Sequence, residues 1–385
     1  DLILDKLGWT NKVRAIVVGH AHLDHVGAIP YIAHRYPNAN IYATPFTMEV
    51  LESILRSENI NFKNKKIHIK SDSIITIKGK SQELKLEFVH TTHSTLQCVF
   101  IALHSREGIF FYALDFKFDN YPIIGKPSNY KRLRELGRMG VKVLVVDALY
   151  SGTDRRTASE RIARNLVEDA LSTVRDRKSA LFVTTFSSHI ARLKSIVDFG
   201  KRTNRKIIFI GRSLNKYVNA ANKVRECSFY KSIRTVRFKN QVNSILKQVE
   251  KDRGKYLIVC TGHQGEPGSI LDRITKDETP FKFRPGDNLI FCSSVIPTQV
   301  NISSRDRMDK KLRKRGVRIQ ADVHVSGHGG REDLRDLLEM LKPKHVIPAH
   351  GSLQQETPMI ELAGELGYKF QENSHLSSNG KLLRI

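Results

Sequence analysis

The chain has 385 residues, too many for one ordinary hydrophobic core and enough for two domains. It carries 64 Lys+Arg against 39 Asp+Glu, a formal charge of +25, and its 40% apolar content argues against a disordered chain. The longest segment without acidic or basic residues, Phe88–Ser105, contains three histidines and is therefore no membrane span. The excess of positive charge favours a polyanionic partner, nucleic acid first, with a mere solubility charge as the alternative.

Cysteine usage argues against two kinds of small scaffold. The four cysteines lie far apart and form no CxxC pair, namely Cys98, Cys227, Cys260 and Cys292. This spacing excludes a zinc ribbon and argues against a disulfide framework. It favours the cytoplasm as the compartment.

In chain order, the first third alternates short apolar runs with polar turns. These runs predict strands at 15–18, 41–43, 66–69, 84–89, 99–103 and 109–114. Helical periodicity predicts helices at 26–35 and 47–56. Strands in succession with helices between some of them indicate mixed sheets covered by helices.

From Val143 onward, strands and helices alternate. Strands are predicted at 143–146, 180–184, 207–210, 256–261 and 288–292, with helices at 159–174, 189–199, 214–225 and 305–315. This alternation is typical of a parallel, doubly wound sheet whose working edge lies at the carboxyl ends of its strands. Because the first pattern returns after Ala321, we expect the middle domain to be inserted into the first, which gives the segments 1–150, 151–319 and 320–385.

The strongest local signal is the segment Gly19–His25 (GHAHLDH), directly after the first predicted strand. Alternation along an extended chain places His20 and His22 on one side, and the turn into the next helix directs Asp24 and His25 toward a second position. Three imidazoles and a carboxylate in one turn have little use other than metal binding. Six residues cannot saturate two metals, so further ligands must come from elsewhere.

Three downstream residues are candidates for these ligands, because a strand delivers each of them into a loop. His93 follows the strand at 84–89, Asp115 ends the strand at 109–114, and His350 stands in the sequence Pro-Ala-His-Gly after a short strand at 346–347. Taken alone, each of them is more often a structural residue.

These motifs together resemble a known family. The HxHxDH segment, the single His, the single Asp and the Pro-x-His-Gly sequence resemble the metallo-β-lactamase fold hydrolases, and the inserted middle domain resembles that of the β-CASP nucleases. Four further elements look like RNase J of the archaeal type, at 115–119 (DFKFD), 261–266 (TGHQGE), 292–297 (CSSVIP) and 324–329 (HVSGHG). The resemblance runs over nearly the whole chain. It implies an α/β fold, a metallo-β-lactamase αββα sandwich with an inserted parallel-sheet β-CASP domain.

One departure concerns the start of the chain. In the resembled family a hairpin of strands precedes the HxHxDH loop, whereas only 19 residues precede His20 here. The N-terminal strands of the sandwich are therefore expected to be missing from the segment 1–150.

The resemblance also implies a ligand set. It assigns His20, His22 and His93 to one zinc and Asp24, His25 and His350 to a second, with Asp115 bridging the two. Manganese suits the same nitrogen and oxygen ligands.

The chemistry of phosphodiester hydrolysis assigns roles to nearby residues. Two metals sharing a hydroxide can hold a phosphate for in-line attack, and Asp24 can orient the water or accept its proton. His328, in a loop that faces the site in the resembled family, is the candidate that protonates the leaving oxygen. Asp147 is predicted to accept a hydrogen bond from His328 or another imidazole of the site and to fix its tautomer and orientation; a turn or capping Asp is the alternative. His189 is predicted to touch the substrate phosphate, with a helix-start histidine as the alternative.

Two turns are candidates for phosphate binding. Ser326, Gly327 and Gly329, around His328, offer amides and a hydroxyl before a helix, and Ser187 and Ser188 precede another helix. The resemblance implies a pocket for a 5′-monophosphate about one nucleotide from the metals. Ordinary turn and cap chemistry is the alternative for all of them.

Basic residues concentrate in the predicted middle domain. Twelve Lys+Arg and one acidic residue lie within 201–240, and eight basic and two acidic residues lie within 305–318. Phe229, Tyr230 and Phe238 interleave with the first stretch and could stack unpaired bases, although most Phe residues should be core.

Three functions remain open at this point. The first is a zinc-dependent 5′→3′ exoribonuclease of RNase J type that acts on single-stranded RNA and, by the resemblance, is a homodimer. The second is an endoribonuclease of the cleavage-and-polyadenylation factor type. The third is a small-molecule hydrolase or a non-catalytic RNA-binding scaffold, against which the inserted domain, the charge of +25 and the intact ligand set argue.

Overall fold

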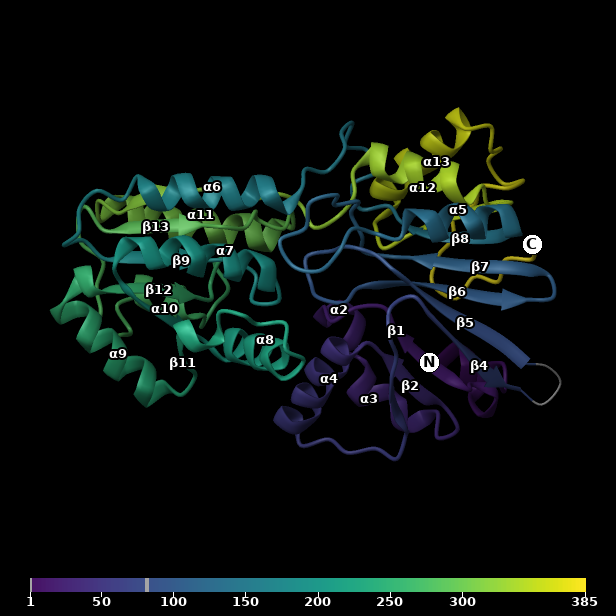
Figure 1. Ribbon diagram of the computed structural model, residues 1–385, viewed down its shortest axis with the longest axis horizontal. Helices are drawn as coiled ribbons and strands as arrows, with labels where there is room; N and C mark the ends of the chain where they lie inside the picture. The colour runs from purple at the N-terminus through teal and green to yellow at the C-terminus, as the bar shows by residue number, and fades with distance from the viewer. Residues whose placement is uncertain (1, 80–82) are drawn as a thin grey trace. The chain divides into compact units, whose positions relative to one another are not determined.

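A computed structural model describes residues 2–79 and 83–385. The chain divides into two compact units: unit 1 comprises Asp1–Ala158 and Gly327–Ile385, and unit 2 comprises Ser159–Ser326 (Figure 1). The sequence-predicted borders at 150/151 and 319/320 lie eight and seven residues before these divisions.

Unit 1 contains two β-sheets. Three parallel strands form the first in the order β1-β2-β3, namely β1 (Ala15–Val18), β2 (Asn40–Ala43) and β3 (Lys66–His68). Six strands form the second in the order β15-β8-β7-β6-β5-β4, namely β4 (Ser73–Lys78), β5 (Glu83–His90), β6 (Val99–Ser105), β7 (Gly108–Ala113), β8 (Val141–Asp147) and β15 (His345–Ala349). The strands from β4 to β7 pair antiparallel, whereas β7, β8 and β15 pair parallel.

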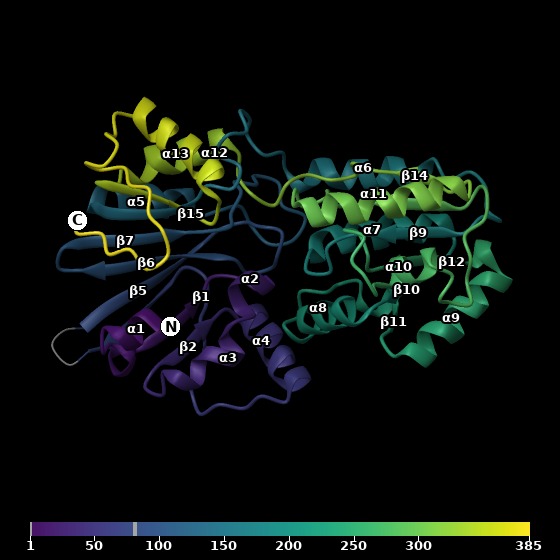
Figure 2. The same ribbon diagram turned by 180° about the vertical axis from the view of Figure 1, so that it is seen from behind.

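The two sheets of unit 1 pack face to face and carry helices on their outer sides (Figures 1 and 2). Tyr42, Phe88 and Val99 belong to one buried cluster between the sheets. The outer face of the larger sheet buries a second cluster with residues of three helices, α5 (Tyr130–Met139), α12 (Arg331–Leu341) and α13 (Leu353–Glu365). Helix α4 (Pro45–Glu58) contacts β2 and β3. The predicted αββα sandwich is confirmed.

The predicted helix at 26–35 is wrong, because the segment forms shorter pieces. It consists of α2 (Leu23–Val26), α3 (Ile29–Ile32) and a 3₁₀ turn (Ala33–Arg35). Pro30 stands in the first turn of α3, where its missing N–H costs nothing, so a new helix begins there instead of continuing from α2.

Unit 2 is built on one parallel sheet. Its six strands lie in the order β11-β10-β12-β9-β13-β14, namely β9 (Leu181–Thr184), β10 (Lys206–Ile210), β11 (Arg234–Val236), β12 (Tyr256–Cys260), β13 (Asn288–Phe291) and β14 (Arg318–Gln320). All neighbouring strands pair in parallel. The predicted parallel sheet of the middle domain is therefore confirmed.

Helices cover both faces of this sheet (Figures 1 and 2). They are α6 (Glu160–Ser172), α7 (Ile190–Gly200), α8 (Arg212–Lys223), α9 (Lys239–Lys251), α10 (Ile270–Thr275) and α11 (Gln299–Lys314). Val242, Ile270 and Met308 bring α9, α10 and α11 into one core cluster with the strands. Strands buried on both faces read as continuous apolar runs, which explains why the sequence predicted most of them.

A fully buried arginine joins the layers of unit 2. Arg192, in α7, donates to both carboxylate oxygens of Glu160 at 2.6 and 2.9 Å and to the carbonyl oxygens of Cys292 and Val323 at 2.7 and 3.1 Å. A buried guanidinium is tolerated only when it is paired and hydrogen-bonded in this way.

No helix among the described residues is long and apolar enough to cross a membrane. The four cysteines are buried, and none of them forms a disulfide.

Candidate metal centre

Strand ends deliver the predicted ligands of unit 1 to one place. His20 and His22 follow β1, and Asp24 and His25 stand in the first turn of α2. His93 follows β5, Asp115 follows β7 and His350 follows β15.

The backbone is unusual at two of these positions. Asp115 has a φ of 51° and His350 a φ of 64°, left-handed values that cost energy for residues other than glycine.

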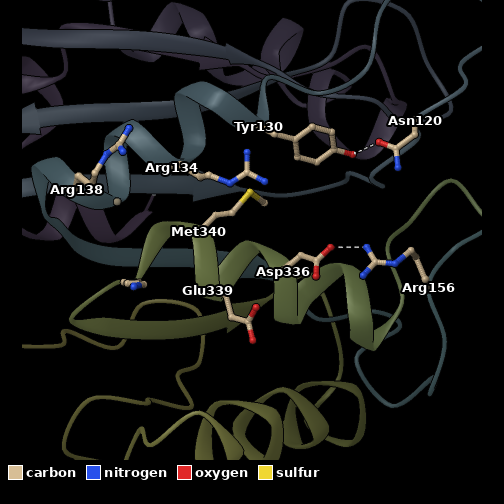
Figure 3. A pocket seen from close by; sticks show the side chains of 10 residues that line it. Asn120, Tyr130, Arg134, Arg138, Arg156, Asp336, Glu339 and Met340 are labelled. Atoms are coloured by element: carbon tan, nitrogen blue, oxygen red, sulfur yellow. Dashed lines mark hydrogen bonds and ion pairs between the residues drawn. The ribbon is translucent and has the colours of Figure 1, made fainter.

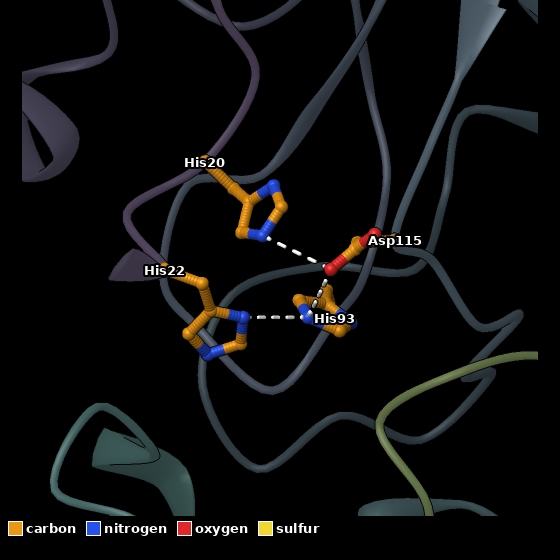
Figure 4. A group of neighbouring side chains, drawn as sticks. All are labelled: His20, His22, His93 and Asp115. Atoms are coloured by element: carbon orange, nitrogen blue, oxygen red, sulfur yellow. Dashed lines mark hydrogen bonds and ion pairs between the residues drawn. The ribbon is translucent and has the colours of Figure 1, made fainter. Parts of the chain in front are cut away.

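The ligand-capable atoms form two groups that share Asp115. The first group is His20, His22, His93 and Asp115, and the second is Asp24, His25, Asp115 and His350. In each group the ligand atoms lie within 4.8 Å of one another (Figure 4 shows the first).

Asp115 lies at the centre of both groups. Its Oδ2 is 3.3 Å from His20 Nε2, 3.2 Å from His25 Nε2 and 3.7 Å from His93 Nε2. Its Oδ1 is 3.4 Å from His350 Nε2. Oδ2 therefore faces imidazoles of both groups, and Oδ1 faces a further imidazole of the second group, so this carboxylate lies where a bridging ligand would be needed.

Several of the ligand-capable atoms have no hydrogen-bond partner within the part of the chain that the structure describes, as expected for atoms that bind a metal ion. His20 Nε2, His25 Nε2 and Asp115 Oδ1 are buried and make no hydrogen bond, although each lies within 3.5 Å of another member of the cluster. Buried polar atoms without partners are costly and rare in native proteins. Imidazole nitrogen and carboxylate oxygen are ligands that zinc prefers.

The pKa shifts of His22, His93 and Asp115 favour the forms that bind a metal. Burial lowers the pKa of His22 and of His93 well below the ordinary value, and neighbouring imidazoles add to the effect. Burial alone would raise the pKa of Asp115, but contact with His20 and His25 holds it far below its usual range. Neutral imidazoles and an ionised carboxylate are the forms that bind a metal.

Contacts outside the two groups orient His93. Its Nδ1 lies 2.7 Å from the carbonyl oxygen of Gly327, which leaves Nε2 for the cluster. A Cβ at Gly327 would lie 2.6 Å from Ser94 Oγ, so only glycine permits this approach. The sequence indicated Gly327 only as a phosphate ligand, because no local pattern reveals a contact across 234 residues.

A third group of metal-capable residues shares Asp115 with the first two and adds Asp147 and His328. His328 Nδ1 lies 2.7 Å from Asp147 Oδ2, and both belong with Asp115 to a set of metal-capable residues. Burial opposes protonation of His328, but the hydrogen bond and charge of Asp147 raise its pKa above the ordinary value. The predicted hydrogen bond between Asp147 and His328 is thus present.

The loop of His328 is tied to its surroundings by backbone contacts. Thr157 Oγ1 donates to the carbonyl oxygen of His328 at 2.7 Å, and the amide of Gly329 donates to the carbonyl oxygen of Phe116 at 2.6 Å. The Gly329 amide is therefore engaged within the fold and is not available to an anion in this conformation.

The remaining predicted residues belong to unit 2. His189 is buried at the start of α7, where Nδ1 accepts from the amide of Arg192 at 3.4 Å and Nε2 lies 3.2 Å from Glu160 Oε2. These contacts match the helix-start alternative, and a contact with substrate stays a prediction. Ser187, Ser188 and Ser326 also lie in this unit.

A separate groove of about 710 Å³ lies between α5 and α12 of unit 1 (Figure 3). The helices touch at Gly137, where a Cβ would lie 2.1 Å from the carbonyl oxygen of Met340. The groove is lined by arginines and by two carboxylates, Asp336 and Glu339, with no histidine or cysteine. It therefore lacks the nitrogen and sulfur ligands of a zinc centre.

Metal removal should destabilise unit 1. A metal present at about 100 times its dissociation constant adds roughly 2.7 kcal/mol, which corresponds to about 5–10 °C in Tm for a domain of this size. We expect a chelator to lower Tm by this amount in thermal denaturation, and His22→Ala to remove most of the metal-dependent shift. His34→Ala, at an exposed histidine outside the cluster, is the matched control and should keep the full shift. An equal Tm with and without chelator would contradict the assignment.

The αββα sandwich, with its His/Asp cluster at the strand ends and an inserted parallel-sheet domain, defines a metal-dependent hydrolase of the metallo-β-lactamase fold. Family models agree: a beta-lactamase superfamily domain matches residues 6–183, the beta-CASP domain of ribonuclease J matches residues 178–306, and a Zn-dependent metallo-hydrolase RNA specificity domain matches residues 316–369.

Curated relatives identify the family. Ribonuclease J of Pyrococcus abyssi is 39% identical over 97% of this chain and 82% of its own length, and ribonuclease J of Methanocaldococcus jannaschii is 37% identical over 97% and 83%. Ribonuclease J 1 of Streptococcus pyogenes is 30% identical over 100% of this chain and 65% of its own length. The chain belongs to the ribonuclease J family, and it is a metal-dependent ribonuclease.

Solved structures also share the fold. A protein of unknown function from Enterococcus faecalis covers 89% of this chain and 76% of its own with a TM-score of 0.58, at 15% identity. This likeness concerns the fold alone.

Proposed function

We propose that the protein is a zinc-dependent 5′→3′ exoribonuclease that degrades single-stranded RNA and prefers 5′-monophosphate ends, acting in RNA decay and maturation. The observation that carries this proposal is the pair of ligand groups around Asp115, with the Asp147–His328 pair beside them.

In this proposal two zinc ions bind per chain. His20, His22 and His93 hold one ion and Asp24, His25 and His350 hold the other, with Asp115 between them; Mn²⁺ is an alternative metal. When bound, such a pair supplies a nucleophile at neutral pH and offsets the charge that develops on the phosphate.

The other side chains act on the substrate and on protons. The Asp24 carboxylate is 58% exposed, far more than Asp115, so it can orient the attacking water or accept its proton. His328 presents Nε2 because its Nδ1 is held by Asp147, and we propose that it protonates the leaving 3′ oxygen. Asp147 is a positioning residue, since it acts through His328.

Ser187, Ser188 and Ser326 in unit 2, and Gly327 in unit 1, are proposed to bind RNA phosphates, and the 5′-monophosphate pocket follows from the family resemblance. Gly329 is left out of the proposed phosphate donors, because its amide donates to the carbonyl oxygen of Phe116. His189 is still proposed to touch the substrate, although its ring nitrogens face Arg192 and Glu160 in this conformation. A pocket that measures one nucleotide from the chain end would make the cleavage exonucleolytic.

Two further properties belong to the proposal. The free, buried cysteines support a reducing compartment, the cytoplasm. A homodimer rests on the family resemblance alone.

The alternative function is an endoribonuclease of the cleavage-and-polyadenylation factor type. Digestion of one RNA labelled at either end separates the two. We expect the 5′ label to appear directly as mononucleotide, while the 3′ label passes through progressively shorter products. Internal fragments from both labelled RNAs would select the endonuclease instead. A substrate with a 5′-hydroxyl end serves as the control for the 5′-monophosphate preference.

A further inference from the structure

Three aromatic residues in the basic stretch of unit 2 have different environments. Phe229 is 2% exposed and packs beside Phe209, so the expectation that it stacks bases is wrong. Tyr230 donates its hydroxyl to Asn219 Oδ1 at 2.8 Å. Phe238 alone is open, with 56% of its surface exposed.

Phe238 lies in a short connection between β11 and α9. Its backbone is extended, with φ −89° and ψ 142°, and the guanidinium of Arg237 lies 4.5 Å from the centre of its ring. Strand β11 is at the edge of the sheet, so the ring lies at the carboxyl end of an edge strand. In open parallel sheets this is the end at which ligands bind.

Positive charge surrounds this position. Unit 2 contains 35 Lys+Arg and 16 Asp+Glu, whereas unit 1 contains 29 and 23, so most of the excess belongs to unit 2. Arg212, Arg234, Arg237 and Lys239 are exposed. None of these four forms an ion pair within residues 2–79 and 83–385.

Hydrogen bonds join the end of β11, next to Phe238, to the start of α8. The amide of Gly211 donates to the carbonyl oxygen of Val236 at 3.0 Å, so Arg212, the first residue of α8, lies beside the end of β11. Asn215 also donates to Thr235 Oγ1 at 3.0 Å. Arg212, at the start of α8, and Arg237, in the connection before α9, therefore lie on neighbouring segments at one edge of the sheet.

The same edge continues toward the proposed phosphate-binding serines. Ser213 Oγ lies 3.0 Å from Ser187 Oγ, which joins the start of α8 to the loop after β9. Arg212, Ser213 and Ser187 thus form a series of polar residues that begins beside the Phe238 segment, and all of them belong to unit 2.

We propose that Phe238 is a stacking platform for one base of single-stranded RNA, with the phosphates on either side held by Arg212 and Arg237. The inference rests on the proposed function, because it takes single-stranded RNA as the ligand. Aromatic rings combined with cations that follow the backbone are how proteins bind single strands without reading sequence. An isolated exposed Phe needs no explanation, but this ring contacts the guanidinium of Arg237, which forms no ion pair within the described residues. Arg234 and Lys239 are near it in the chain, and Arg212 lies at the neighbouring helix start.

The test compares an unstructured RNA with an abasic strand of the same length and charge. Binding is measured by fluorescence anisotropy in the Asp115→Ala background, so that the RNA is not cut. Because one stacked base contributes about 1–3 kcal/mol, we expect Phe238→Ala and Phe238→Leu to weaken binding of the normal strand roughly 5-fold to 100-fold and to leave the abasic strand unaffected. Arg212→Ala and Arg237→Ala should weaken both strands.

Phe370→Ala, at another exposed phenylalanine, is the matched control and should bind both strands normally. Unchanged affinity of Phe238→Ala for the normal strand, or equal losses on both strands, would overturn the inference. If Phe238→Leu bound the normal strand with full affinity, an apolar contact would explain the binding and the stacking inference would be wrong. The anisotropy assay measures binding and does not depend on the direction of cleavage. The stacking inference can therefore fail while the end-label digestion still supports the exonuclease, and the reverse.

Discussion

Asp115→Ala should abolish RNA cleavage while RNA binding remains. Asp115 is the residue that the two ligand groups share among the described residues, and its Oδ2 faces imidazoles of both groups. Since bound metals contribute several kcal/mol of transition-state stabilisation, and 1.36 kcal/mol is tenfold in rate, we expect a loss of about 10³-fold or more. Single-turnover degradation of a labelled RNA measures the rate, and anisotropy measures the binding.

The control for Asp115→Ala is Asp119→Ala, a second buried aspartate four residues along the same loop that belongs to no ligand group. It should retain cleavage far better. Cleavage by Asp115→Ala within tenfold of the unaltered protein would mean that the metal lies elsewhere.

His328→Ala should give the second large loss. General acid catalysis contributes about 10²–10⁴-fold, and the hydrogen bond to Asp147 orients the imidazole of His328 and favours its protonated form. Asp147→Asn, which keeps the shape but removes the charge, should cost about 10–100-fold because residues behind a functional imidazole have effects of this size.

The double variant of Asp147 and His328 distinguishes a shared function from two separate ones. If Asp147 acts only through His328, the double variant should be no slower than His328→Ala alone, because the single losses are then not additive. Losses that multiply would show that Asp147 has a role of its own. Thermal denaturation of all three variants separates lost function from lost folding.

The metal cluster was predictable in part because much of it is local. Four ligand candidates lie within His20–His25, and a short segment with that composition has few structural uses. His93, Asp115 and His350 could be selected because each follows a strand. Strands β5, β7 and β15 run in the same direction, so their carboxyl ends lie at the same edge of the sheet. Their division into two groups required the family resemblance.

Other features depended on contacts that sequence spacing does not reveal. The carbonyl of Gly327 holds His93, and the amide of Gly329 is taken by Phe116, which removes one predicted phosphate ligand. Both contacts join segments far apart in the chain.

Burial also could not be read from residue type alone. Phe229 and Phe238 stand nine positions apart in the same basic stretch, but one packs into the core and the other is exposed. Strand β4 (Ser73–Lys78) was not predicted, because residue type does not follow its alternating burial throughout: Ile74 lies on the exposed face, and so no alternation of apolar and polar residues runs through the whole strand. The edge strand β11 has only three residues and gave no apolar run.

The most direct test is a titration of metal-free protein with Zn²⁺, in which bound metal and RNA cleavage are measured on the same samples. We predict that cleavage is absent without metal and returns as two ions bind per chain, and that His22→Ala binds fewer ions and stays inactive at matched zinc. Full cleavage by the metal-free protein, or normal metal binding and cleavage by His22→Ala, would contradict the assignment of the cluster as the catalytic metal centre.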